Sequence, residues 1–395
     1  MKRTCYAFAL MAFTLSMGTM FGCTPLAVRA IHEPFHPSST QQITLSAEAE
    51  STRGIAEISI VQRTLTRDRY CAPYVAGECL PLPTIKETTV QTCQIEPPSS
   101  PASCRALVGP FQDGSFVTYG ARAKDATGMV AGDQWIGFGV GAQADPSEPI
   151  AVYVRSDAAK AVDVVMVPVD YNGTPGRGPA DFASDARRLI VDGYLAHAQI
   201  TGNRSKWNFY LNPATGGLVR SNISGTEQRS ITQPANWTRI AATANAAAYV
   251  HHDATWRDFG NFGGANGVGQ LTIQAGTPGT IVHETGHAVF GLSDEYCCDG
   301  GIISTSWPHE NMFTSLAACQ ASATAHGLPT ASCTQLTTTN GFCGGADASG
   351  TPILGSTDLK WRQDTASDLM GCGGNNGAAG GILDSERIQW YYNTL

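Results

Sequence analysis

The sequence has little charge and no concentrated basic segment. Only 15% of its 395 residues are charged, and 25 Lys and Arg against 33 Asp and Glu leave a formal net charge of −8. A nucleic-acid partner is therefore not expected, because binding to a phosphate backbone needs clustered Lys and Arg. Beyond the N-terminal segment no stretch is apolar enough to span a bilayer, and no internal repeat is visible.

What the chain does contain is apolar residues, glycine and cysteine. Hydrophobic residues make up 42% of it, which excludes a disordered chain and allows one or two domains with their own cores. Gly (43) and Cys (12) are both abundant. This composition favours a loop-rich, exported protein with disulfides over a helix-rich cytosolic one.

Residues 1–22 have the pattern of an export signal of the lipoprotein type. Lys2 and Arg3 precede an uncharged apolar stretch that is short for a membrane-spanning helix. Met20-Phe21-Gly22-Cys23 resembles a bacterial lipobox, which implies acylation of Cys23 after cleavage. We therefore expect an exported protein of the bacterial cell envelope, anchored to the membrane through Cys23. The alternative is ordinary secretion, with Cys23 as a spare thiol.

Without Cys5 and Cys23, ten cysteines remain, four before residue 105 and six after residue 296. An even number supports up to five disulfides in an oxidising compartment. The split suggests two separately cross-linked parts. Connectivity does not follow from spacing, and Cys71–Cys79 and Cys93–Cys104 are the nearest local pairs.

Hydrophobic patterning divides the mature chain into two domains. Residues 23–42 are rich in Pro, Ser and Gln and are expected to be a tether. Alternating apolar and polar residues predict strands over 43–141, which we interpret as a small immunoglobulin-like β-sandwich with a Cys- and Pro-rich loop at 68–104. Residues 142–157, with two acidic-Pro pairs, are expected to be a linker.

The pattern changes in 158–395, where strands and helices alternate. Pro179 is expected to open a helix with one apolar face formed by Phe182, Ala186, Leu189, Ile190 and Gly193. Strands are predicted at Val162–Val169, Trp207–Leu211, Ala244–His251 and Gly269–Ala275. This order indicates an α/β unit. A closing helix with Asp384 as its cap is expected at Asp384–Tyr392.

The segment His283-Glu284-Thr285-Gly286-His287 carries the clearest chemistry. Thr277-Pro278 is expected to cap and open a helix through it. Residues four apart lie on one face of a helix, so both imidazoles can reach one zinc ion. Glu284 beside them can take a proton from water at the metal.

A zinc site with two His ligands needs a third protein ligand. Gly291 can adopt the left-handed conformation that ends a helix and turns the chain back. Asp294 then lies three residues beyond the turn and is the expected ligand, with the longer Glu295 as the alternative. Three protein ligands leave the fourth zinc position for water, as in catalytic sites.

The segment His283–Tyr296 (HETGHAVFGLSDEY) closely resembles the signature of the IgA-peptidase-like family of bacterial zinc metallopeptidases, which belong with the metzincin-type enzymes. The likeness extends loosely over 160–300. It implies a metzincin-like α/β (α+β) peptidase domain with one catalytic zinc, acting on extended protein or glycoprotein substrates. It also implies that Gly269–Ala275 is the edge strand that aligns the substrate backbone. The late glycine and the Asp at the third-ligand position depart from the common metzincin pattern and agree with this variant.

Metzincins also place a methionine beneath the zinc. Met370, in Ser367–Cys372, is the best match, and Met312 is the competing candidate. Either methionine could instead be ordinary core packing. His251 and His252 end a predicted strand, where adjacent side chains point to opposite faces, so at most one could bind the metal. A core or loop role is the competing interpretation for both.

Three functions fit these residues. The first is hydrolysis of peptide bonds, with Glu284 as general base. The second is a lipid-anchored binding or adhesion protein in which the metal is only structural. The third is zinc-dependent hydrolysis of glycosylated or non-protein amide substrates. An open coordination position and a Glu that is not a metal ligand argue against the second function, since a structural site needs neither.

Overall fold

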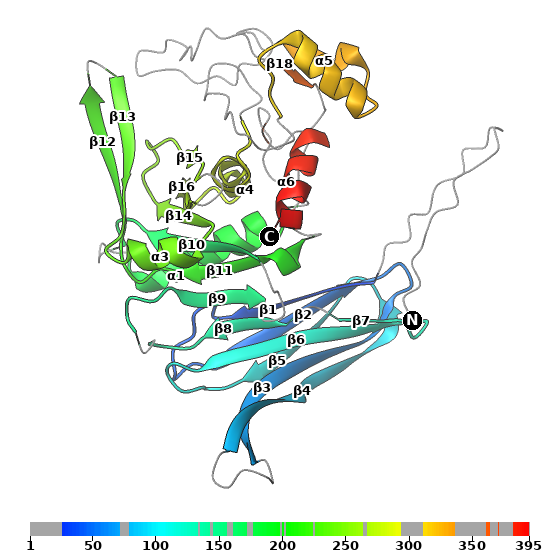
Figure 1. The fold of residues 1–395 in the computed structure, drawn as a ribbon. Coiled ribbons are helices and arrows are strands. Elements are labelled where there is room, and N and C mark those ends of the chain that lie inside the picture. Colours follow the sequence, from blue (N-terminus) through cyan, green and yellow to red (C-terminus); the bar gives the residue numbers. More distant parts are fainter. Residues whose placement is uncertain are drawn as a thin grey trace, which may run out of the picture.

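The structure is a computed structural model of the chain. It describes residues 26–71, 79–132, 135–142, 145–155, 161–171, 177–197, 200, 203–223, 226–263, 267–293, 311–335, 361–363, 370 and 382–394. The signal peptide (1–22), Cys23, Asp294 and Glu295 lie outside these ranges. The described chain is a mixed α+β structure that is mostly sheet with few helices (Figure 1).

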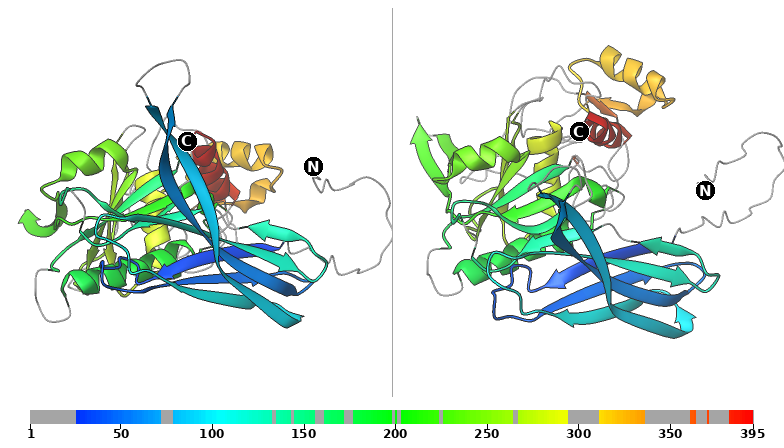
Figure 2. Two further views of the ribbon diagram at one scale, coloured as in Figure 1. Left: turned by 90° about the horizontal axis from the view of Figure 1, so that it is seen from below. Right: turned by 60° about the horizontal axis from the view of Figure 1, so that its bottom comes forward.

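The N-terminal part is a sandwich of antiparallel strands. One sheet has the order β1 (Ala27–Glu33), β2 (Ile43–Glu50), β5 (Ala102–Val108). The facing strands are β3 (Ile55–Cys71), β4 (Cys79–Ser99), β6 (Phe116–Asp125), β7 (Val130–Gly132) and β8 (Ile136–Gly139). Alternate residues of β2 and β5 are buried, which is how a sheet with one core face packs. The β3–β4 hairpin projects from the sandwich (Figure 2).

Two expectations for this part are wrong. Residues 27–33 of the expected tether form β1, which pairs along its whole length with β2. The expected Cys- and Pro-rich loop at 68–104 is mostly strand, because β3 and β4 continue their pairing out to Cys71 and Cys79. The Pro-rich composition suggested irregular chain in both places. Pairing with a neighbouring strand satisfies the backbone hydrogen bonds and outweighs this local preference.

A buried histidine shows how firmly the supposed tether belongs to the fold. His32 has no exposed surface and stacks on Phe138 with ring centroids 3.8 Å apart. Its Nδ1 lies 3.0 Å from the Tyr119 hydroxyl and its Nε2 lies 3.1 Å from the Phe35 carbonyl oxygen. Burial lowers the pKa of His32 from 6.5 to about 3, and the nearby Arg187 acts in the same direction.

His32 should therefore make the protein sensitive to acid. The folded state keeps the ring neutral while the unfolded chain takes up a proton, so its contribution is complete above pH 6.5 and is lost as the pH falls toward 3. We expect the wild type to lose about 2–3 kcal/mol more unfolding free energy than His32→Gln between about pH 6.5 and 4.5. Urea titrations across this range measure the difference, and parallel profiles for the two proteins would contradict it.

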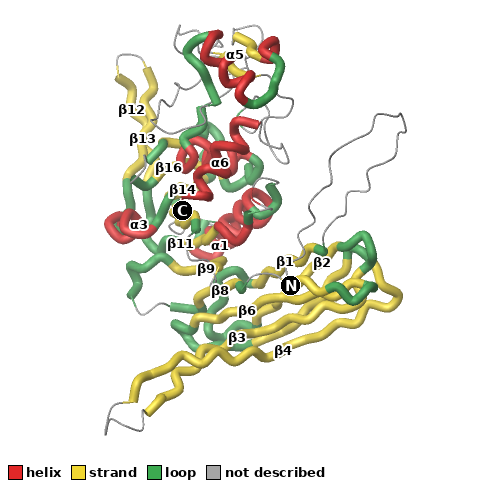
Figure 3. The backbone as a smooth tube through the Cα atoms, turned by 45° about the vertical axis from the view of Figure 1, so that its right-hand side comes forward, coloured by secondary structure: helices red, strands yellow, loops and turns green. Residues whose placement is uncertain are grey.

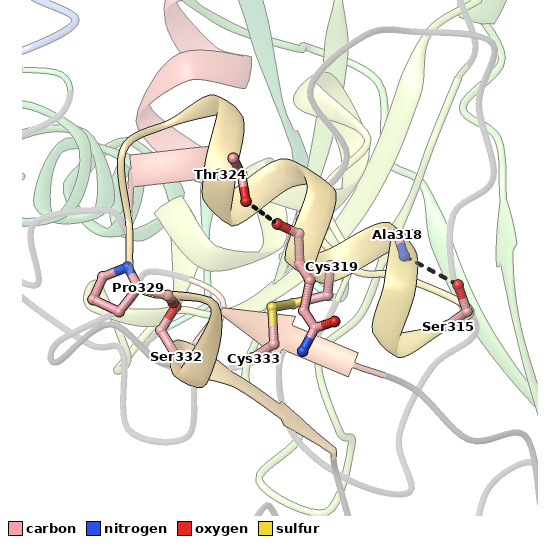
Figure 4. Close-up of a disulfide and its surroundings, with 8 residues drawn as sticks. Ser315, Ala318, Cys319, Thr324, Pro329, Ser332 and Cys333 are labelled. Atoms are coloured by element: carbon pink, nitrogen blue, oxygen red, sulfur yellow. Dashed lines mark hydrogen bonds between the residues drawn. A yellow bond between two sulfur atoms is a disulfide. The ribbon is translucent and has the colours of Figure 1, made fainter.

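Two disulfides lie in the described residues. Cys93–Cys104 joins β4 to β5 across 11 positions, which confirms one local pairing expected from the sequence. Cys71 and Cys79 are register partners in the β3–β4 hairpin, but their side chains lie outside the described part. The other disulfide, Cys319–Cys333, ties α5 (Leu316–Ala325) to β17 (Cys333–Gln335) (Figure 4).

The C-terminal part is built on parallel strands. Its strand order is β15 (Gly260–Asn261), β16 (Gly269–Gln274), β14 (Ala246–His251), β10 (Val162–Pro168), β11 (Trp207–Leu211), β9 (Ile150–Arg155). The strands β16, β14, β10 and β11 run parallel, whereas β15 and β9 are antiparallel to their neighbours. The four strands predicted from the sequence are therefore confirmed, with ends that differ by up to two residues.

The linker expected at 142–157 contains a strand instead. Within it, β9 pairs with β8 of the sandwich on one side and with β11 on the other. In the described residues this produces one 11-stranded sheet that runs from β15 to β4. The Asp-Pro and Glu-Pro pairs lie just before β9, so the compositional signal marked the turn and not the strand.

Helices pack around the parallel strands (Figure 3). The helix α1 (Pro179–Arg188), continued by η1 (Leu189–Tyr194), buries the predicted apolar face. The remaining elements are η2 (Arg204–Lys206), β12 (Gly217–Ile223), β13 (Thr226–Thr232), α3 (Trp237–Thr243), α4 (Thr280–Thr285), η3 (Gly286–Phe290), η4 (Thr330–Ser332), β18 (Trp361–Gln363) and α6 (Ile382–Thr394). None of the described helices is long and apolar enough to cross a membrane.

The closing helix begins earlier than predicted. Because α6 starts at Ile382, Asp384 lies inside its first turn and is not its cap. Tyr392 is 1% exposed, and its hydroxyl accepts a hydrogen bond of 2.7 Å from Trp207 Nε1. This contact attaches α6 to the strand β11.

Candidate metal centre

The candidate metal-binding motif, His283–His287, lies on α4 and η3, which follow β16 directly. The helix begins at Thr280 with Gly279 as its N-cap, so the expected start, with Thr277 as cap and Pro278 as first residue, is two residues too early. The Thr277 hydroxyl donates to the Gln274 carbonyl at 2.9 Å and closes the turn after β16. The N-cap residue is Gly279, so the Thr277 hydroxyl does not cap the helix.

The two histidines of the motif lie on the same side of one helical turn. The ring centroids of His283 and His287 are 5.0 Å apart, with the ring planes at 87° to each other. Both side chains are 8% exposed, and Glu284 between them is 6% exposed. The spacing of four residues thus brings the two imidazoles together, as the sequence predicts.

The orientation of His287 is set by its backbone partner. Its Nδ1 lies 2.7 Å from the carbonyl oxygen of Leu292. A carbonyl can only accept, so Nδ1 carries the proton and Nε2 keeps its lone pair. This is the arrangement typical of a histidine that binds a metal through Nε2.

The chain reverses directly after the motif. Gly291 has φ +64° and ψ +33°, a left-handed conformation that suits glycine. A Cβ at this position would lie 3.2 Å from both the Arg387 guanidinium and the Phe262 ring. Arg387 is 1% exposed and donates from Nε to the Phe290 carbonyl at 2.7 Å. The end of η3 is therefore held by Arg387 of α6, a residue that the sequence pattern did not predict.

A second residue not predicted from the sequence fixes the chain two positions later. Asn311 donates from Nδ2 to the Ser293 carbonyl at 2.8 Å and accepts from the Ser293 N–H at 3.0 Å. Asn311 is 3% exposed and Ser293 is equally buried. The two hydrogen bonds hold Ser293, which follows the acceptor of the His287 hydrogen bond and precedes the expected ligand Asp294.

Asn311→Ala should therefore weaken both folding and metal binding. Two hydrogen bonds to a buried peptide are lost, which should cost about 1–3 kcal/mol in unfolding free energy. Loss of such an outer partner should weaken zinc affinity about 10-fold or more. Competition titration of the metal-free protein with a chromophoric chelator measures the affinity.

The exposed Asn393 of α6 provides the matched control. Asn393→Ala should leave zinc affinity unchanged, since its Oδ1 only accepts from Gln389 on the same helix. Equal zinc affinities for the Asn311→Ala and wild-type proteins would show that the hydrogen bonds to Ser293 do not support the metal site.

Met370 packs against Gly286, a residue between the two histidines of the motif. It has no exposed surface, and its Sδ is 2.6 Å from the position that a Cβ on Gly286 would occupy. Only glycine at 286, between the two histidines, allows this approach. Met312, the competing candidate, is also buried, at 1% exposure. Met370 is the methionine that contacts Gly286 of the motif.

The residues present fit a zinc ion, but the third ligand is not defined. Both expected candidates, Asp294 and Glu295, lie outside the described residues. Within the described ranges no group of three His, Cys, Asp or Glu side chains comes close enough to hold a metal. The case for metal therefore rests on the His283 and His287 pair and on the Leu292 carbonyl that holds Nδ1 of His287.

The other two histidines considered from the sequence have partners elsewhere. His251 is fully buried and its Nε2 lies 2.8 Å from Asp258. His252 lies 3.0 Å from Asp185 of α1. Neither carboxylate belongs to the motif, so the structure places both histidines with partners outside it.

The strand expected at the sheet edge is not at the edge. β16 has β14 on one side and the two-residue β15 on the other, through the pairs Gly260↔Leu271 and Asn261↔Gln270. A Cβ at Gly260 would lie 2.4 Å from the Glu284 carbonyl and 2.8 Å from His287 Cβ. The backbone strand next to the histidines is thus β15, which has no hydrophobic pattern that could have revealed it.

Comparison with known proteins adds no assignment. No protein-family model matches the chain, and no curated protein matches it in sequence. A DUF4466 family protein from Parabacteroides merdae is similar over 27% of this chain and 42% of its own, at 13% identity and a TM-score of 0.19. The sporulation control protein Spo0M from Bacillus subtilis is similar over 31% and 50%, at 12% identity and a TM-score of 0.19. Similarities this weak carry no argument for fold or function.

Proposed function

We propose that this protein is a zinc-dependent endopeptidase of the metzincin type. The observation that carries the proposal is the single helical turn that presents His283 and His287 together, with Glu284 beside them and His287 Nδ1 held by a carbonyl. The packing of Met370 beneath Gly286 supports it. His283, His287 and Asp294 would hold the ion, with Glu295 as the alternative to Asp294.

The chain's own groups have distinct tasks in this reaction. Bound zinc would supply a more acidic water and polarise the scissile carbonyl. Glu284 takes the proton of the attacking water and passes it to the leaving amine. An extended substrate would lie along β15, adding its backbone to the open edge of that strand.

The proposal includes export and a lipid anchor at Cys23. The disulfides Cys93–Cys104 and Cys319–Cys333 support an oxidising compartment, where such bonds persist. In this setting the substrates would be proteins or glycoproteins outside the cytoplasm.

Digestion of casein and gelatin by the purified chain tests the proposal. Activity should disappear with a chelator and return with added zinc, and metal analysis should find one zinc ion per chain. Proteomic profiling of cleavage sites would then define the substrate class. Bound zinc without any hydrolysis of protein or glycoprotein would instead favour a structural metal in an adhesion protein.

A further inference from the structure

The start of the sandwich leaves no room for a stalk between the lipid anchor and the fold. The described chain begins at Leu26, which is 9% exposed, and β1 begins one residue later. Only Thr24 and Pro25 separate Leu26 from Cys23. The three residue-to-residue steps from Cys23 to Leu26 span at most about 10 Å, even when fully extended. An acyl group on Cys23 would therefore hold this end of the sandwich close to the bilayer.

Strand registers show which residues share this end. Ala27 pairs with Glu50, the last residue of β2, so the turn at 51–54 lies here. The Ser51 N–H donates to Ser100 Oγ at 3.0 Å, which brings in the turn between β4 and β5. The Ala126 N–H donates to the Gly54 carbonyl at 3.0 Å and adds the turn between β6 and β7. We call residues 51–54, 99–101 and 125–130 the turn face; Figure 1 shows β7 at this end of the sandwich.

The turn face carries two neighbouring apolar side chains in contact with solvent. Met129 is 46% exposed and Val130 is 63% exposed. The Asp125 carboxylate accepts from the Thr127 and Met129 N–H groups at 2.9 Å each. These backbone donors are already satisfied, so less hydration is lost when the turn enters a less polar layer.

Two basic side chains flank the apolar pair. Arg53 has a side chain that is 49% exposed, and its Nη1 donates to Thr127 Oγ1 at 3.3 Å. Lys124 is exposed, with Cε 3.9 Å from the position of a Cβ on Gly128. Long basic side chains beside apolar ones suit the headgroup layer, where the stems are buried and the charges reach phosphate. Glu50 at the same end is acidic and partly offsets the positive charge of Arg53 and Lys124.

We propose that the turn face docks on the phospholipid headgroup layer, with Met129 and Val130 entering it beside the acylated Cys23. The proposal rests on the lipid anchor and is independent of the peptidase activity. Two apolar side chains alone would not hold the protein on a membrane. The anchor keeps the face at the surface, and the face fixes the orientation of the sandwich, and of the sheet it shares with the metal centre.

Site-specific photocrosslinking to lipid tests this orientation. Benzoylphenylalanine is placed at Val130 or, as a matched control, at Leu107, which is 66% exposed. Leu107 is the register partner of Thr44, six residues from Glu50 along β2, so it lies about 20 Å from the turn face. The full lipidated chain is reconstituted in vesicles of phosphatidylethanolamine with phosphatidylglycerol, and lipid adducts are measured by mass spectrometry.

We expect several-fold more phospholipid adduct from position 130 than from position 107. Cys23→Ser protein added to the same vesicles should give adducts from neither position. Equal yields at the two positions, or more adduct at 107, would overturn the proposal, as would mature protein without acyl groups on Cys23. Peptidase assays on the same samples report separately on the metal centre, so failure of one proposal is distinguishable from failure of the other.

Discussion

Glu284→Gln is expected to keep its zinc and lose about 10²-fold or more in peptidase turnover. The amide has nearly the shape of the carboxylate and fits the same 6%-exposed position. It cannot accept the proton of the attacking water, so proton transfer to the leaving amine fails. Single-turnover cleavage of a fluorogenic peptide, together with metal analysis of the same sample, measures both quantities.

The informative comparison is with a carboxylate outside the motif. Asp185 lies on α1, where its carboxylate accepts a hydrogen bond from Tyr171 and lies 3.0 Å from His252 Nε2. Asp185→Asn should leave turnover near that of the wild type. Substantial proteolysis by Glu284→Gln would exclude this residue as the general base. Loss of zinc from Glu284→Gln would instead indicate that Glu284 helps to hold the metal.

His283→Ala is expected to abolish stable zinc binding. Loss of an outer hydrogen-bond partner of a metal ligand costs about 10–100-fold in affinity, and loss of a ligand itself should cost more. Since metal binds only the folded state, zinc should raise the melting temperature of the wild type and not that of the variant. Metal analysis and thermal unfolding with and without zinc provide the readouts.

His252→Ala is the matched control for this experiment. The sequence left His252 open as a metal ligand, but the structure pairs it with Asp185. Its removal should leave zinc content and the zinc-dependent melting shift intact. A full complement of zinc in His283→Ala would show that the metal binds at another part of the chain, and the peptidase proposal would then be wrong.

The parts of the site that the sequence predicted are those encoded by local spacing. His283 and His287 share a face because they are four residues apart in a helix, and Gly291 turns the chain because glycine tolerates positive φ. The residues that support them come from far along the chain. Asn311 lies 18 residues beyond Ser293, and Arg387 lies 97 residues beyond Phe290. No periodic pattern links such pairs, so only the fold reveals them.

The same distinction explains the errors in the fold. Alternation within one strand predicted β2 and β6 well, because their burial is set by a single face. In the segments that became β1 and β9, prolines at or next to the strand favoured a tether and a linker. Both became strands because partners elsewhere in the sequence, β2 for β1 and β8 and β11 for β9, were available to pair with them. Sequence composition describes a segment in isolation, whereas pairing depends on what lies beside it.

The pairing of β8 with β9 has a practical consequence for dissecting the protein. A fragment that starts at the linker expected from the sequence would contain β9 but not its neighbour β8. Its N–H and C=O groups on that side would have no partner, and such bare strands readily recruit strands of other molecules. Expression of the C-terminal half alone should therefore yield aggregates, and functional work on the candidate metal centre is better done with the sandwich left in place.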